Sequence, residues 1–247
     1  MIIDHPTAAR QRQLRALWQE AFGDEDAYLD IFFGTAFSRD RCLCAVEEGQ
    51  VVSAVYWLDC LCRGRKLAYL YALATGEAFR GRGIASALMA DVHSLLAGSG
   101  YRGAILSPGS ESLFRFYRRM GYETVGFVTE QTVSAGTPLP LREIGRQEFA
   151  ALRRELLPAN GLRQEGANLA YLSRFARFYA GADWIAAVSG STAAEYLGPE
   201  DRIPGLLGTL GLDQARVRLP GNDRPLVMGL SLNGQPLQEV YFGFPFD

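Results

Sequence analysis

Two arginines and two glycines alternate in the segment Arg80-Gly81-Arg82-Gly83, which lies between an apolar run at residues 67–75 and an amphipathic stretch at residues 84–96. Glycine lets the backbone approach a ligand closely and adopt conformations that other residues disfavour. The helix expected after Gly83 would direct its unpaired N–H groups at the same place, which favours an anion there. These residues therefore predict a phosphate-binding loop between a strand and a helix.

Two other uses of such a loop are a turn without a ligand and a dinucleotide site. A glycine pair also makes a tight connection between a strand and a helix without any ligand, and the pair alone does not separate the two uses. Dinucleotide binding needs a third glycine, where this chain has Ser86, and an acidic ribose ligand about 20 residues further on, which no strand here provides. The sequence therefore disfavours a dinucleotide.

A second segment with a recognisable pattern follows the loop. Residues 104–107 read as a strand, and Ser110 is a suitable N-cap for a helix that would end near Gly121. One face of this helix is expected to carry Leu113, Phe116, Tyr117 and Met120. The pattern predicts a strand, a capped helix and a turn in that order.

Together these two segments resemble the GNAT superfamily of acyl-CoA N-acyltransferases. The run Arg80-Gly81-Arg82-Gly83-Ile84 matches the Arg-Gly-x-Gly-Ile variant of the loop that binds the coenzyme A pyrophosphate in that family, and residues 117–122 match its Tyr-x-x-x-Gly-Phe/Tyr helix end. The resemblance covers residues 1–133. The chain has Ser110 where the family often has Asn, and Glu77 where it often has Pro. Neither change removes an expected backbone contact.

The resemblance implies an α/β (α+β) GNAT fold with a mixed central sheet flanked by helices. The strand at residues 67–75 would splay from its neighbour at 101–107 and bind the pantetheine arm of acetyl-CoA along its exposed edge. A backbone N–H near Leu73 would stabilise the oxyanion of the tetrahedral intermediate. The residues expected to bind the coenzyme are Leu73, Ala74, Thr75, Arg80, Gly81, Arg82, Gly83, Ile84, Ala85 and Ser110.

The general acid of the family corresponds to Tyr117, which would protonate the leaving thiolate, since a tyrosine with a pKa of about 10 holds its proton at neutral pH. The alternative is an aromatic core residue of an amphipathic helix. Many relatives use a glutamate of the central strand as the base, but residues 67–75 contain no carboxylate. Glu77, Asp59 and Glu130 could act through water; such acids are more often solvated, and no base is assigned.

The first 65 residues fit the same fold. Their periodicity predicts two amphipathic helices and two antiparallel strands, at residues 8–22, 25–37, 41–47 and 51–61. Each strand carries a Cys-x-Cys pair, at residues 42–44 and 60–62, and zinc sites usually have a wider spacing. Alternate strand residues share a face, so buried reduced thiols are expected rather than a metal site.

Composition excludes several classes of protein. The hydrophobic fraction of 48% suffices for a buried core, and a net charge of −2 disfavours nucleic acid or an anionic membrane as partner. No apolar run approaches the length of about 20 residues that a membrane helix needs, and the N-terminus lacks a signal-peptide core. A cytoplasmic enzyme is expected.

A domain boundary is expected at residues 134–141, where glycine and prolines interrupt the strand pattern. It separates the GNAT domain at 1–133 from a smaller unit at 142–247. The run Ala27-Tyr28-Leu29 recurs in this unit as Ala170-Tyr171-Leu172. This repeated motif predicts a second, degenerate GNAT-like α/β domain, although short matches also arise by chance.

The second unit is expected to lack catalytic residues and to form one wall of the acceptor cleft. Residues 197–202 stand where the glycine loop would be, and no Tyr-x-x-x-Gly helix follows Gly221. The closing segment at residues 240–246 is rich in aromatic residues and predicts a strand docked into a sheet. A homodimer interface is the competing use of that segment.

Three functions remain open from the sequence. The resemblance favours an N-acetyltransferase that moves an acetyl group from acetyl-CoA to a primary amine of a small molecule or peptide. The alternative is a non-catalytic acyl-CoA-binding protein whose second unit recruits a partner. A nucleotide-binding protein of another fold ranks third.

Overall fold

The computed structural model describes residues 1–245. The first half contains β1 (Ile2–Asp4), α1 (Gln11–Phe22), α2 (Asp26–Thr35), β2 (Cys42–Glu47), β3 (Gln50–Cys62), β4 (Arg65–Thr75), α3 (Ile84–Gly98), β5 (Gly103–Leu106), α4 (Glu111–Arg118) and β6 (Glu123–Ser134). The second half contains β7 (Arg142–Ile144), α5 (Arg146–Leu156), β8 (Arg163–Gln164), α6 (Ala167–Leu172), β9 (Arg177–Ala180), β10 (Ile185–Ser189), β11 (Thr192–Leu197), α7 (Ile203–Leu210), β12 (Gln214–Pro220) and β13 (Arg224–Ser231). The helices and strands expected in the first half are all present.

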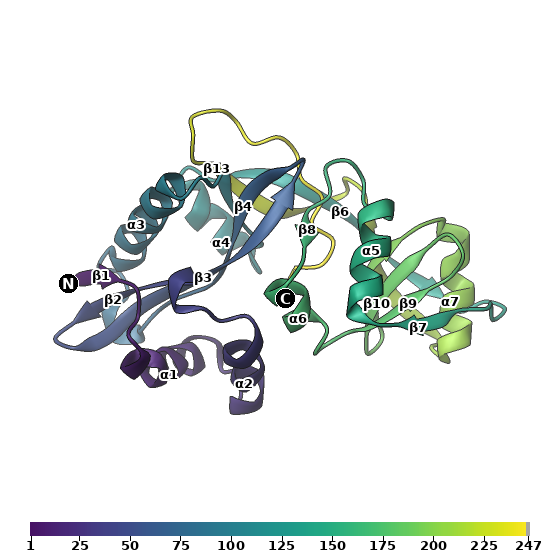
Figure 1. Ribbon diagram of the computed structural model, residues 1–247, viewed down its shortest axis with the longest axis horizontal. Coiled ribbons are helices and arrows are strands. Elements are labelled where there is room, and N and C mark those ends of the chain that lie inside the picture. The colour runs from purple at the N-terminus through teal and green to yellow at the C-terminus, as the bar shows by residue number, and fades with distance from the viewer. Residues whose placement is uncertain (246–247) are drawn as a thin grey trace.

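The strands form one mixed sheet that runs through both halves (Figure 1). Its order is β1-β2-β3-β4-β5-β13-β6-β12-β11-β10-β9-β7, and β8 pairs with β3 off this path. The pairs β4·β5 and β11·β12 are parallel, and the others are antiparallel. The expected mixed sheet flanked by helices is confirmed.

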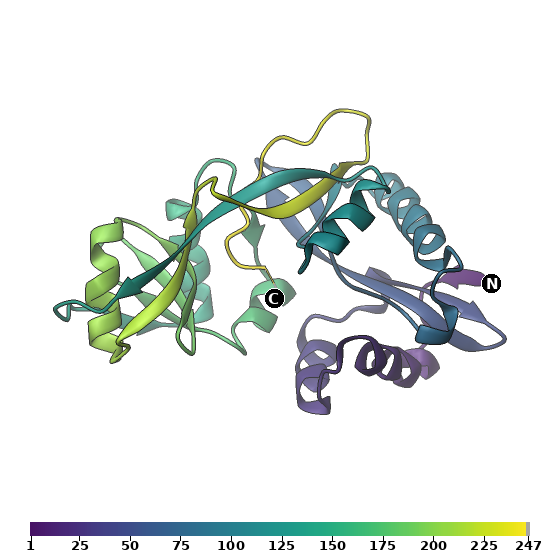
Figure 2. The same ribbon diagram turned by 180° about the vertical axis from the view of Figure 1, so that it is seen from behind.

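The two halves repeat one arrangement of elements. In the first half the order is β1, two helices, three strands, α3 and β5. The second half has the same order, with β7, α5, α6, three strands, α7 and β12, except that the two-residue strand β8 lies between α5 and α6. Their last strands are exchanged, because β13 pairs with β5 while β6 pairs with β12. Figure 2 shows β6 and β13 crossing side by side between the halves. The division into domains at 1–133 and 142–247 stays a prediction.

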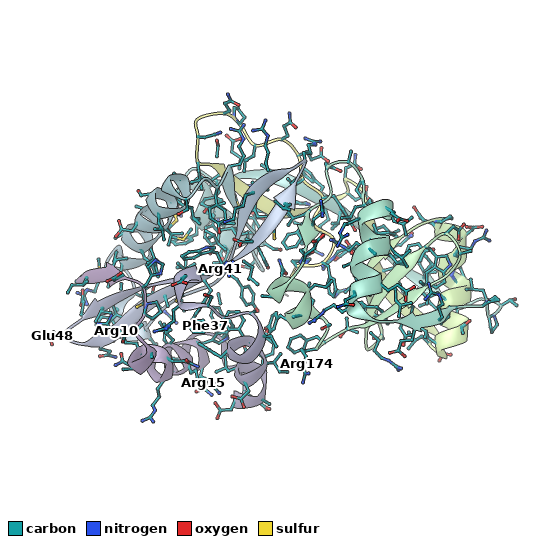
Figure 3. All side chains as sticks on the ribbon, in the orientation of Figure 1. Arg10, Arg15, Phe37, Arg41, Glu48 and Arg174 are labelled. Carbon is teal, nitrogen blue, oxygen red and sulfur yellow. The ribbon has the colours of Figure 1, made fainter. Side chains whose placement is uncertain are left out.

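The sheet of the first half is covered on both faces, and strand alternation sorts its residues between them. Cys42 and Cys44 face the core that contains α1 and α2, whereas Leu43 faces the core that contains α3 and α4. All four cysteines are buried free thiols, as expected. Burial raises the pKa of the Cys42 thiol well above its ordinary value. On the solvent side, Arg15 of α1 pairs with Asp26 and Asp30 of α2 (Figure 3).

A buried polar network in the second half includes Gln164 of β8, the short strand that pairs with β3. The Arg153 guanidinium donates to both carboxylate oxygens of Glu195, at 2.5 and 2.9 Å, and to the Leu162 carbonyl at 2.9 Å. Arg153 and Glu195 are 3% and 1% exposed, so this ion pair lies entirely inside the protein. Gln164 extends the network to the Phe244 carbonyl.

The closing segment differs from its prediction. Residues 240–245 are buried but form no strand: the Val240 N–H donates to the Val125 carbonyl of β6 at 2.8 Å, and Tyr241 makes an isolated bridge with Gly161. Phe242 packs on the Tyr69 ring of β4 with ring centroids 4.7 Å apart. Phe246, the last residue of the predicted strand, lies outside the described residues. Among residues 1–245, no helix combines the length and apolarity needed to span a membrane.

The network predicts a large loss of stability when one charge is removed. Glu195→Leu should lower the free energy of unfolding by about 3–5 kcal/mol, because it leaves the Arg153 charge buried without a partner. The double variant Arg153→Met/Glu195→Leu should recover much of that loss, as measured by urea denaturation. Glu143→Leu, which breaks the exposed pair with Arg177, should change stability little. A single variant as stable as the wild type would contradict this interpretation.

Candidate active site

The central strand β4 separates from β5 halfway along its length. The two strands pair only from Leu67 to Tyr69, and the expected splay is therefore present. On the other side, Ala54 pairs with Ala74 but Tyr56 pairs with Tyr71, so two residues of β4 face one of β3. Ala72, at the centre of this bulge, has a φ of 51°. The bulge bends β4 and leaves the edge of its second half open.

The backbone groups of Thr75 point into this opening. The Gly76 N–H donates to the Val52 carbonyl at 2.9 Å, and the alternation of an antiparallel ladder then turns the groups of Thr75 away from β3. Its carbonyl accepts a hydrogen bond from Arg80 Nε at 3.1 Å. The side chain of Arg80 thus fastens the glycine loop to the end of β4.

The glycine loop has the backbone geometry that its sequence predicts. Gly81 and Gly83 have φ values of 75° and 76°, in the left-handed region that favours glycine. Gly83 is the N-cap of α3, and no side chain caps that helix. The first N–H groups of α3 are consequently available to an anion at the helix N-terminus.

Two cavities adjoin this loop and the open edge of β4. One has a volume of about 560 Å³ and the other about 410 Å³, and they share Phe22, Leu73, Leu113 and Tyr117. Of the predicted site residues, the larger cavity is lined by Leu73, Ala74, Thr75, Arg80, Gly81, Gly83, Ile84, Ala85 and Tyr117. The structure therefore brings nine of the eleven predicted residues together.

The remaining two predicted residues do not line either cavity. Arg82 turns away from the loop, pairs with Glu47 at 2.9 Å and lies over the Phe79 ring. Ser110 caps α4 by accepting a hydrogen bond from the Leu113 N–H at 3.4 Å. Neither side chain faces the cavities: Arg82 contacts neighbouring side chains and Ser110 caps a helix.

Tyr117 lies where the two cavities meet. Its ring is buried, and its hydroxyl has no hydrogen-bond partner among the described residues. Burial raises the pKa of Tyr117 to about 12, so the hydroxyl is protonated at neutral pH. The predicted apolar face of α4 is partly wrong, because Phe114 is buried whereas Leu113 is 41% exposed. Leu113 faces the cavities, which apolar periodicity alone cannot distinguish from a core.

The smaller cavity contains one ionisable group that the sequence analysis did not identify. Asp24, between α1 and α2, is the only charged side chain among the described residues that line it, and its Oδ2 accepts a hydrogen bond from Trp18 Nε1 at 2.7 Å. Tyr69 and Tyr71 of β4 line the same cavity, and the Tyr71 and Tyr28 hydroxyls are 2.7 Å apart. The carboxylate lies in an irregular turn, where no periodic pattern marks it.

None of the three carboxylates considered from the sequence lines either cavity. Asp59 is paired with Arg41 at 2.7 Å, and Glu130 is paired with Arg218 at 2.9 Å. Glu77 lies in the turn before the loop, where its N–H donates to Glu20. These positions remove all three as direct candidates for a base.

His93 forms a side-chain contact beside the candidate site. It lies partly buried on α3, and its Nε2 is 2.7 Å from the hydroxyl of Tyr122. Burial lowers the pKa of His93 to about 4 and raises the pKa of Tyr122 well above its ordinary value, so the pair is neutral at neutral pH. The Tyr122 ring packs against the Tyr117 ring, with centroids 5.7 Å apart.

Comparison with known proteins supports one family for this arrangement. Residues 3–125 match the family described as acetyltransferase (GNAT) domain. No curated protein sequence matches the chain.

Solved structures resemble the chain over almost its whole length. They include GCN5-related N-acetyltransferases from Kribbella flavida (17% identity, TM-score 0.73, covering 94% of this chain and 72% of that one) and from Anabaena variabilis (14%, 0.75, 94% and 73%). Eis1 from Mycobacterium abscessus is similar to a comparable degree (14%, 0.69, 94% and 74%). At these identities the likeness shows the fold alone, and it extends through both halves.

The His93 contact predicts a dependence of stability on pH. Burial lowers the pKa of His93 from its ordinary value of 6.5 to about 4 in the folded protein. The unfolded chain therefore binds this proton first, and stability falls as pH decreases from about 6.5 to 4. His93→Gln cannot titrate, and its thermal midpoint should fall less over this range. The pKa values of Asp59 and Glu130 are lowered in the folded protein, so their protonation at low pH also reduces stability. This effect is the same in both proteins, and the difference between the two curves therefore reports His93. Parallel curves would contradict the assignment.

Proposed function

We propose that the protein transfers an acetyl group from acetyl-CoA to a primary amine of a small molecule or peptide. The chain belongs to the GNAT acetyltransferase family, whose domain matches residues 3–125. The observation that carries the proposal is the junction of the glycine loop, the open edge of β4 and Tyr117 at one pair of cavities. Acetyl transfer follows from the domain, whereas the amine and the roles of individual residues are proposed.

The larger cavity is suited to the coenzyme. The pyrophosphate would lie against the N–H groups of Ile84 and Ala85 at the uncapped start of α3, where the helix dipole favours negative charge. Arg80 adds a positive charge beside it. The pantetheine arm would then lie along the open edge of β4 near Thr75 and direct its thioester towards Tyr117.

The chemistry at the junction is an acyl transfer. The amine nitrogen attacks the thioester carbonyl carbon, a C–N bond forms, and the negative charge on oxygen is stabilised by a backbone N–H near Leu73. The tetrahedral intermediate then expels the coenzyme thiolate, and the C–S bond breaks. Tyr117 donates its proton to that sulfur and recovers one from the amine nitrogen through solvent. Its high pKa keeps the hydroxyl protonated before each turnover.

The smaller cavity supports an amine as the acceptor. Asp24 supplies a negative charge that attracts an ammonium group, and Trp18, Tyr69 and Tyr71 present aromatic surface on which such a cation binds favourably. Asp24 is also the carboxylate through which the ammonium would lose its proton before attack. An acyl-CoA-binding protein without catalysis would not need this group.

The function is tested by following release of the coenzyme thiol from acetyl-CoA with a panel of primary amines. Turnover with at least one amine supports the transferase, and tight coenzyme binding without turnover would favour the non-catalytic alternative. Gly83→Val should abolish binding of coenzyme A in calorimetric titration, because a β-branched residue disfavours a φ of 76°. Gly49→Val, which places the same strain in the β2–β3 turn, should still bind. No binding by the wild type would overturn the proposal.

Tyr117→Phe should lower kcat by about a hundredfold and leave the Kd for coenzyme A nearly unchanged, because it removes only the proton donor. The matched variant Tyr122→Phe removes a hydroxyl that lies outside both cavities and should retain turnover. Because burial raises the pKa of Tyr117 to about 12, this group should cause no loss of kcat between about pH 7 and pH 10. Wild-type turnover by Tyr117→Phe would remove the residue from the mechanism.

Asp24→Asn should raise KM for the amine by about tenfold or more, since it removes the charge that attracts the ammonium group. The new side chain keeps an oxygen that accepts the Trp18 hydrogen bond, so the fold should be preserved. Asp26→Asn, two residues further on and outside both cavities, serves as the control. An unchanged KM for the amine in steady-state assays would contradict the proposed role.

A further inference from the structure

A third cavity lies at the opposite end of β4 and has no part in the proposed reaction. Its volume of about 610 Å³ exceeds that of either cavity of the candidate site. It lies between the turn that joins β3 to β4 and the loop at residues 232–240, which is the yellow loop at the top of Figure 1. Along β4, Leu67 in this cavity and Thr75 in the other are about 26 Å apart at about 3.3 Å per residue.

Among the described residues, three arginines and no carboxylate line this cavity. They are Arg63 and Arg65 from the turn and Arg102 from the start of β5. Arg63 donates to the side-chain oxygen of Gln238, and Arg102 donates to that of Gln235 at 3.2 Å. These amide partners orient the guanidinium groups without neutralising their charge.

The cavity is therefore positively charged, in contrast to other arginine sites of the protein. Arg41, Arg82 and Arg153 each pair with a carboxylate. Arg65 lines the cavity, and its guanidinium has no hydrogen-bond or ion-pair partner among the described residues. Asp59, a carboxylate of neighbouring β3, is already held by Arg41 and Lys66.

The wall of the cavity is formed in advance of any ligand. Leu237 reaches from the loop onto the sheet, where Gly103 and Gly229 leave room for it; a Cβ at either glycine would lie within 2.9 Å of its side chain. Arg102 also donates to Asn233 at the other end of the loop. The loop is thus fixed by an apolar contact and a polar one, and the cavity between them is an open, preorganised site.

We propose that this cavity binds a small organic anion, whose oxyanion group is held by the guanidinium groups of Arg63, Arg65 and Arg102. Guanidinium groups bind carboxylates and phosphates through bidentate, charge-assisted hydrogen bonds, which are stronger than hydrogen bonds between neutral groups. Leu67 and Leu237 supply apolar surface for the rest of the ligand. The site is separate from the coenzyme site, because the loop before α3 lies at the other end of β4.

The experiment is calorimetric titration of the full chain in the presence of saturating coenzyme A, which blocks the glycine loop. Citrate probes for a carboxylate ligand, and inorganic pyrophosphate probes for a phosphate ligand. At least one probe should bind the wild type with a Kd of about 1 mM or lower, and the probe that binds more tightly identifies the class of anion.

Arg65→Gln should weaken that binding by about tenfold, because it removes one charged donor and breaks no contact within the protein. Arg146→Gln removes an exposed arginine at the start of α5 and should bind as the wild type does. Absence of binding by both probes, or equal binding by Arg65→Gln and the wild type, would overturn the proposal.

Discussion

The bulge in β4 is the constraint on which the candidate site depends. Because two residues of β4 oppose one of β3 around Ala72, the strand bends after Tyr69 and cannot continue its ladder with β5. Backbone groups that would otherwise pair within the sheet are left at an open edge. The glycine loop begins where that edge ends, and Arg80 fastens it to Thr75, so strand and loop are presented to one ligand together.

The second half completes the sheet of the first. β13 pairs with β5 on the side away from β4, so β5 keeps a neighbour although β4 leaves it. The aromatic closing segment packs Phe242 against Tyr69, one strand position before the opening. Gln164 of β8 and the buried Arg153–Glu195 pair join this segment to α5 and β11. The repeated order of elements fits the proposal of two related units with exchanged last strands.

Local sequence patterns predict only part of the candidate site. The loop at residues 80–84 and the helix with Tyr117 were found because glycine positions, caps and apolar periods depend on near neighbours. The exchange of β6 and β13, the burial of His93 and the place of Asp24 were not found, because they depend on contacts between distant residues. A pattern of apolar residues likewise could not separate a cavity wall, such as Leu113, from a core.

The central claim is that backbone amides along β4 and at the start of α3 hold acetyl-CoA. Amide hydrogen exchange with and without the coenzyme measures those groups directly. The account predicts slower exchange on binding at Thr75 and at residues 84–86, with little change in the second half of the chain. Unchanged exchange at these amides when the coenzyme is bound, or protection confined to another part of the sheet, would contradict it.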